Sequence, residues 1–215
     1  MINTLFISTD HPDAVRITLE ILSGGGLVAF PTDTIYGVAA LVNSPTGIDR
    51  LYEAKARSAN KAIAVLIGEL EQLARLTPGL TLSAQRLARR FWPGALTLVV
   101  PKHPDLPANL SSLPTVGVRM PDHTFARSLM AISGPLATSS ANISGETNTL
   151  TAQQVMDQLG GRIELILDGG TVPGGVPSTV VDCTQDPPRV LRQGAISAED
   201  ILTAASDGAA SSAAA

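Results

Sequence analysis

The segment from Pro135 to Gly145 has the side chains best suited to hold a polar ligand. It reads PLATSSANISG, so hydroxyl and amide groups follow a short apolar stretch and end at a glycine. It contains no acidic, basic or thiol side chain. We therefore expect any reaction beside it to depend on positioning and hydrogen bonding more than on a covalent protein nucleophile.

Four other polar clusters contain hydrogen-bond donors, and three of them contain cations. They are Thr32 to Gly37, Lys55-Ala56-Arg57 with Lys61, Thr115 with Arg119, and Ser178-Thr179 with Arg192-Gln193-Gly194. If the clusters converge, then Lys55, Arg57, Arg119 and Arg192 surround a cleft that suits phosphates and a carboxylate.

Each cluster also has a simpler explanation. Lys55 and Arg57 follow a predicted helix and could be its solvated C-terminal cations. Arg119 could form a surface ion pair with Asp122, and Thr32 to Thr34 could serve only as turn and cap residues. The sequence leaves these alternatives open.

Common cofactor motifs are missing. The run from Gly169 to Gly175 lacks the Gly-Lys-Ser/Thr ending of a phosphate loop, and no dinucleotide fingerprint follows Gly24. The three histidines are widely separated, with no second ligand at metal-binding spacing, and the single cysteine, Cys183, excludes an intramolecular disulfide. We expect no dedicated metal site in the protein.

Hydrophobic periodicity predicts the elements that position these clusters. Helices are expected over residues 14–22, 46–55, 70–76, 83–91, 124–132, 152–159 and 199–204. Strands are expected over 27–30, 35–42, 62–67, 96–100, 116–119, 136–139, 163–167, 179–183 and 189–191. Thr151 and Ser197 are expected to cap the last two helices.

The alternation predicts an α/β fold in which about eight strands form a mixed sheet flanked by helices. The polar clusters follow or end predicted strands, where ligands usually bind in open α/β sheets. We expect one domain over residues 1–205 and a flexible tail, rich in Ala and Ser, over 206–215.

Composition argues against some classes of protein. Aromatic residues make up 3% of the 215 residues and the formal net charge is -4, which weakens a single-stranded nucleic-acid binding function. No apolar run approaches the length of a membrane span, so we expect a cytoplasmic protein with no membrane contact.

Seven motifs together resemble the YrdC/Sua5 family and follow its order. They are Thr32 to Gly37, Lys55-x-Arg57 with Lys61, Trp92-Pro93-Gly94, Val118-Arg119, Ser140-Ala141-Asn142-x-Ser144-Gly145, Ser178 to Asp182, and Leu191 to Gly194. The resemblance extends from about Leu19 to Ile201. Each motif is weak alone, but seven in order make coincidence implausible. The resemblance implies a YrdC-like open twisted sheet, similar to the DHBP-synthase-type fold, in the short single-domain form.

The resemblance also implies an activity. Members of this family condense L-threonine, bicarbonate and ATP into threonylcarbamoyl-AMP and pyrophosphate, a nucleotidyltransferase reaction. The product serves the N6-threonylcarbamoyl modification of adenosine 37 in tRNA. Mg2+ is expected to enter with the ATP phosphates. The implied partners are a downstream threonylcarbamoyl transferase complex and, in some members, tRNA or double-stranded RNA.

The matching motifs assign roles to individual residues. The catalytic set implied is Lys55, Arg57 and Arg119. The ATP contacts implied are Arg57, Lys61, Thr115, Ser140, Asn148 and Arg192. The threonine contacts implied are Thr34, Arg119, Thr138 and Ser178. Asn142 and Ser144 are expected to shape the loop. Ser58 and Ala62 stand where the family usually has proline, or glycine at the second position, and Asn148 stands where serine is common.

Two alternatives to the synthetic activity remain. One is a related family member that binds nucleotide without making the threonyl product. The other is an RNA-binding module that uses the predicted basic helix face of Arg86, Arg89 and Arg90.

Overall fold

The computed structural model describes residues 2–59 and 61–206 of the chain. In these ranges ten strands form one sheet in the order β1-β8-β2-β3-β7-β4-β6-β5-β9-β10. The strands are β1 (Leu5–Ser8), β2 (Val28–Phe30), β3 (Gly37–Leu41), β4 (Ala64–Leu66), β5 (Leu96–Pro101), β6 (Thr115–Arg119), β7 (Leu136–Ser140), β8 (Leu165–Asp168), β9 (Thr179–Asp182) and β10 (Arg189–Arg192). The predicted α/β class with a mixed sheet is confirmed.

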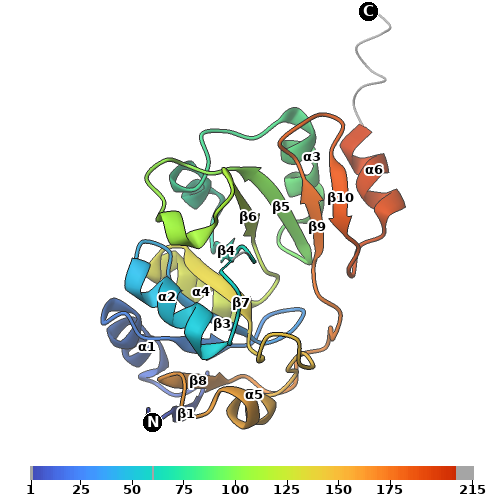
Figure 1. Cartoon of the computed structure of the whole chain (residues 1–215). Helices are drawn as coiled ribbons and strands as arrows, with labels where there is room; N and C mark the ends of the chain where they lie inside the picture. Colours follow the sequence, from blue (N-terminus) through green and yellow to red (C-terminus); the bar gives the residue numbers. More distant parts are fainter. Residues whose placement is uncertain (1, 60, 207–215) are drawn as a thin grey trace, which may run out of the picture.

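The sheet mixes parallel and antiparallel neighbours. The parallel pairs are β1 with β8, β8 with β2, β4 with β6, and β5 with β9, and the other five pairs are antiparallel. Strand β7 lies antiparallel between β3 and β4, so it joins the two halves of the sheet. Figure 1 shows β1 at one end of the molecule and β10 with the last helix at the other.

Helices cover both faces of the sheet. On one face α1 (Ala14–Ser23) and α4 (Thr124–Ser133) share a core with β2, β3, β4, β7 and β8. The other face packs against α2 (Pro45–Ala54), α3 (Leu82–Phe91), α5 (Ala152–Leu159) and α6 (Ala198–Ser206). Short 3-10 helices occupy Leu70–Arg75 and Ala108–Leu110. The two faces follow from the alternation of side chains along each strand.

Strand β6 shows how this alternation makes room for a ligand. Val116 and Val118 are buried in the core shared with α2, α3, α5 and α6. Thr115, Gly117 and Arg119 therefore point to the opposite face, the one that α1 and α4 cover farther along the sheet. The part of that face over β6, β5 and β9 contains polar or small side chains.

One expectation about the elements is corrected. The sheet has ten strands in the described ranges, and the sequence did not predict β1. That strand lies at the edge, with Leu5 and Phe6 exposed, and its partner β8 begins at Leu165, so no local pattern marks it. The helix predicted over residues 70–76 is present over 70–75 and is of the 3-10 type.

The predicted helix caps are confirmed. The hydroxyl of Thr151 accepts a hydrogen bond from the amide of Gln154 at 3.2 Å, and that of Ser197 from the amide of Asp200 at 3.1 Å. The predicted tail lies outside the described residues except for Ser206, which ends α6. No described helix combines the length and apolar character needed to cross a bilayer.

Candidate functional site

A cavity of about 400 Å³ opens on the sheet face described above, over β4, β6, β5 and β9. Nine of the residues expected in the site line it. They are Thr34, Arg57, Thr115, Arg119, Thr138, Ser140, Asn148, Ser178 and Arg192. These residues come from segments up to 158 positions apart, between Thr34 and Arg192. All five polar clusters therefore contribute residues to one cavity, as expected if they converge.

Three strand residues that line the cavity have small side chains or none. They are Gly37 of β3, Ala64 of β4 and Gly117 of β6. A Cβ added at Gly37 would lie 3.0 Å from Cγ2 of Thr138, and one at Gly117 would lie 3.1 Å from Cγ2 of Thr97. Larger side chains at these three positions would fill part of the cavity, so its depth depends on the small residues there.

Arg119 is the most buried cation that lines the cavity, with 6% of its surface exposed. Its Nη2 donates to Oδ1 of Asp33 at 2.5 Å, its Nη1 to the hydroxyl of Thr34 at 2.9 Å, and its Nε to the carbonyl of Gly94 at 2.9 Å. Burial lowers the pKa of Arg119, and the charge of Asp33 opposes that effect. The partner is thus Asp33, and the alternative of a surface pair with Asp122 is wrong.

Ser178 lies between two other side chains of the site. Its hydroxyl shares a hydrogen bond of 2.8 Å with that of Thr97, and its carbonyl accepts one from Nη2 of Arg192 at 2.8 Å. Burial lowers the pKa of Arg192. An arginine keeps its proton in proteins, so the side chain brings a positive charge to this wall of the cavity.

Arg57 supplies a third guanidinium group. Its Nε donates to the carbonyl of Lys61 at 3.1 Å, and its Nη2 to that of Ala62 at 2.9 Å. Burial lowers its pKa. These bonds fix the side chain along the cavity wall, so Arg57 is more than a solvated cation after α2.

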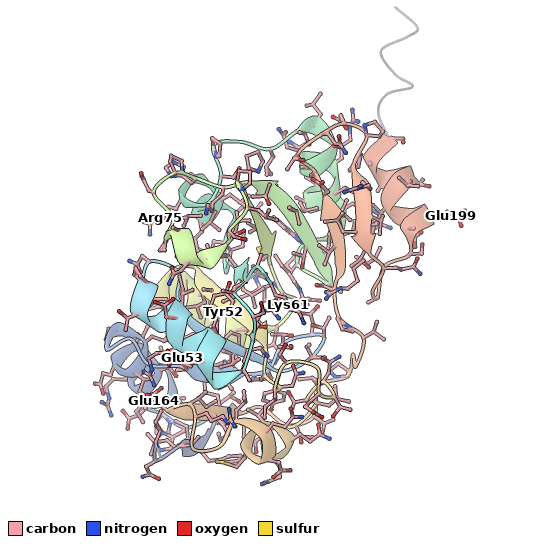
Figure 2. The ribbon with its side chains drawn as sticks, in the orientation of Figure 1. Tyr52, Glu53, Lys61, Arg75, Glu164 and Glu199 are labelled. Carbon is pink, nitrogen blue, oxygen red and sulfur yellow. The ribbon has the colours of Figure 1, made fainter. Side chains whose placement is uncertain are left out.

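Four residues expected at the site do not line the cavity: Lys55, Lys61, Asn142 and Ser144. The side chain of Lys61 is exposed, and its carbonyl accepts a hydrogen bond from the hydroxyl of Tyr52 at 3.3 Å. Figure 2 labels both residues. Asn142 donates to the carbonyls of Ile143 and Glu146 within its own loop, at 2.9 and 2.8 Å.

Lys55 lies behind the cavity wall. It is 1% exposed, and its Nζ donates to the carbonyls of Ser140 and Asn142. Burial lowers its pKa to about 7, and the positive charge of Arg57 adds to this effect. Both sequence expectations about its place are corrected: it is not a solvated helix-terminal cation, and it does not surround the cavity.

Asp33 and Thr97 also contact site residues, although the sequence alone predicts no role for either. Asp33 stood in a cluster already singled out, so its charge next to two threonines was an available signal. Thr97 had a weaker signal, since it is a polar residue in the predicted strand 96–100. Only the pairing of β5 with β9 brings it to Ser178.

The backbone at Ala56 turns the chain between Lys55 and Arg57. Its φ of 48° lies in the left-handed region, which costs L-residues about 1–2 kcal/mol. Glycine removes this cost but loses more conformational entropy on folding. We therefore expect Ala56→Gly to raise the free energy of unfolding by about 0.5 kcal/mol. The control Ala54→Gly changes the buried last residue of α2 and should lower it by about 1 kcal/mol. Urea denaturation measures both, and equal destabilisation would contradict the prediction.

The described residues that line the cavity contribute hydroxyl, amide and guanidinium groups but no carboxylate or thiol. Elsewhere in the described ranges, no three His, Cys, Asp or Glu side chains gather where they could hold a metal. The arrangement is suited to bind anions through charge-assisted hydrogen bonds.

Comparisons with known proteins find relatives over most of the chain. The Sua5/YciO/YrdC family model, described as "Telomere recombination", matches residues 20–194. The threonylcarbamoyl-AMP synthase of Pyrococcus abyssi is 43% identical over 189 residues, covering 87% of this chain and 56% of that protein. The one of Bacillus subtilis is 41% identical over 198 residues, covering 91% and 57%.

A solved structure extends this similarity to three dimensions. The crystal structure of P. abyssi Sua5 complexed with L-threonine superposes with a TM-score of 0.89 at 40% identity. The match covers 94% of this chain and 61% of that one. The chain thus spans less than two thirds of the length of these relatives.

Proposed function

Because the chain belongs to the Sua5/YciO/YrdC family, we propose that it makes threonylcarbamoyl-AMP from L-threonine, bicarbonate and ATP. The observation that carries the proposal is the set of three guanidinium groups, from Arg57, Arg119 and Arg192, around one cavity. Two substrates of this reaction are anions that repel each other, and a third carries a carboxylate. Fixed cations lower the cost of holding them together.

The reaction needs no protein nucleophile. The neutral amine of threonine either adds to the carbon of CO2 and loses a proton or reacts with bicarbonate and releases water, and both routes give a carbamate. A carbamate oxygen then attacks the α-phosphorus of ATP, and the bond from that phosphorus to the bridging oxygen breaks as pyrophosphate leaves with the electron pair. The cavity lining, with donors and cations but no carboxylate or thiol in its described residues, is suited to stabilise this charge.

The two ends of β6 suggest how the substrates divide the cavity. Arg119 ends the strand beside Thr34, and we assign the threonine carboxylate to this end, with Thr138 and Ser178. Thr115 begins the strand, four residues away or about 13 Å. In the proposal ATP contacts Thr115, Arg57, Ser140, Asn148 and Arg192.

In the proposal, magnesium enters the site bound to ATP. The described lining offers no carboxylate cage, so the protein's own residues do not fit a resident Mg2+ site. In the proposal Mg2+ stays on the phosphate oxygens, which is common because this ion dehydrates reluctantly. A transferase that accepts the product, and a contact with tRNA or double-stranded RNA, stay predictions.

The test is the substrate dependence of pyrophosphate release. With ATP and Mg2+ present, we expect release only when L-threonine and bicarbonate are both added, and mass spectrometry should find threonylcarbamoyl-AMP. D-Threonine is the matched control, since it has the same functional groups with the opposite chirality. Release from ATP that ignores L-threonine would show that the proposal is wrong.

A further inference from the structure

The side chain and the backbone of Lys55 both form hydrogen bonds with residues 140–144. Its Nζ donates to the carbonyls of Ser140 and Asn142, and its own carbonyl accepts a hydrogen bond from the amide of Ser144 at 2.9 Å. The residue directly follows α2, and the segment directly follows β7. Lys55 therefore joins two elements that are 85 residues apart in sequence.

The segment that Lys55 contacts begins a loop, residues 140–149, that carries two residues of the cavity wall, Ser140 and Asn148. The ends of the loop are already fixed. The amide of Ala141 donates to the carbonyl of Tyr36 at 2.8 Å, and the hydroxyl of Thr149 donates to the carbonyl of Ala141 at 3.1 Å. Lys55 fixes the stretch after Ser140, between these ends.

The chemistry of an amine suits this role. Burying a polar group is costly unless it finds hydrogen-bond partners, and the two carbonyls provide them. A lysine has three N–H donors when charged and two when neutral, so it can satisfy both carbonyls in either state. The contact therefore persists on both sides of the pKa of about 7 that burial and Arg57 impose.

We infer that Lys55 is a positioning residue: it holds the 140–149 loop against the end of α2, so that Ser140 and Asn148 stay on the cavity wall, and it does not touch the nucleotide. The identity of the nucleotide rests on the proposed function, whereas the anchoring of the loop does not. The competing assignment, a direct contact with phosphate, requires Nζ to face the cavity, and Lys55 is not among its lining residues.

Three variants separate the two assignments. Lys55→Met removes the donors and the charge. Lys55→Gln keeps two N–H donors without a charge, although its chain is one atom shorter. Arg57→Met is the matched control, since it removes a neighbouring cation that does line the cavity. The measurements are amide hydrogen exchange at Ala141 and Ser144, and calorimetric binding of a non-hydrolysable ATP analogue and of L-threonine.

For Lys55→Met we expect amide exchange at Ala141 and Ser144 to accelerate about tenfold or more. The ATP analogue should bind about tenfold more weakly, while the affinity for L-threonine stays the same. Lys55→Gln should recover part of the amide protection and part of the ATP affinity. Arg57→Met should weaken ATP binding and leave both amides as protected as in the unsubstituted protein.

Two results would overturn the inference. One is weak ATP binding by Lys55→Met with normal protection of both amides, which indicates direct contact. The other is a Lys55→Gln protein that protects both amides normally yet binds the ATP analogue about tenfold more weakly than the unsubstituted protein, which indicates that the charge matters. If Lys55→Met does not fold, Lys55→Gln decides alone by the same criteria. An unsubstituted protein that binds no ATP analogue would contradict the proposed function, and the exchange measurements would still test the anchoring.

Discussion

Replacing Arg119 with methionine should lower threonine-dependent pyrophosphate release by about a hundredfold or more. Arg119 is the buried guanidinium that lines the cavity, and three protein groups fix its orientation. Methionine is shorter and uncharged, so it cannot bind the carboxylate that the proposed function assigns to Arg119. We therefore expect the affinity for L-threonine to fall, as measured by calorimetry without ATP, and the ATP affinity to change little.

The same substitution leaves Asp33 without its cation. Asp33 is 17% exposed, so its carboxylate is mostly shielded from water. We expect Arg119→Met to lower the free energy of unfolding by about 2 kcal/mol, and Asp33→Asn in the same chain to restore much of that loss. Activity should stay low in the double variant. If stability and activity recovered together, Arg119 would be structural and the threonine assignment would be wrong.

Replacing Gly194 with alanine should disturb the site from a position that does not line it. A Cβ at Gly194 would overlap the carbonyl oxygen of Pro177 and lie 2.6 Å from the amide nitrogen of Thr179. Both contacts are with backbone, which cannot rotate away. Ser178 lies between these residues, so the added methyl group must displace it. We expect the free energy of unfolding to fall by about 2–3 kcal/mol and the KM for L-threonine to rise.

Gly79→Ala is the control for a general effect of losing glycine. No described atom outside its chain neighbours lies within 4 Å of the added Cβ, so the stability should change by no more than about 0.5 kcal/mol. Chemical denaturation and steady-state kinetics measure both variants. A Gly194→Ala protein as stable and active as Gly79→Ala would show that residues 177–179 can shift without moving Ser178 out of place.

Periodicity was a good guide to most elements of this fold. The helix predicted at residues 14–22 spans 14–23, and the strand predicted at 96–100 spans 96–101. Both have strong local signals, since the helix ends at a glycine run and the strand is apolar and bounded by turn residues. Strand β1 has no such signal, because an edge strand is defined by the neighbour it pairs with.

The site was predictable in its membership more than in its contacts. Polar residues at strand ends, such as Thr34 and Ser140, were expected to meet and do. The partner of Arg119 was not predictable, since Asp122 is three residues away in the sequence and Asp33 is 86 residues away. Lys55 and Arg57 show the same limit. They are two residues apart and both cationic, yet one points behind the wall and the other along it, with the left-handed backbone of Ala56 between them.

The strand order also governs when the site can exist during synthesis. Strand β9 pairs with β5 in parallel, and β8 inserts between β1 and β2. Ser178 and Arg192 thus reach the cavity only after residues up to 192 have left the ribosome, although Thr34 emerged long before. Such distant pairings are intrinsically slow to form. A truncated or nascent chain should therefore have no partial affinity for its substrates, and ligand binding should report directly on completed folding.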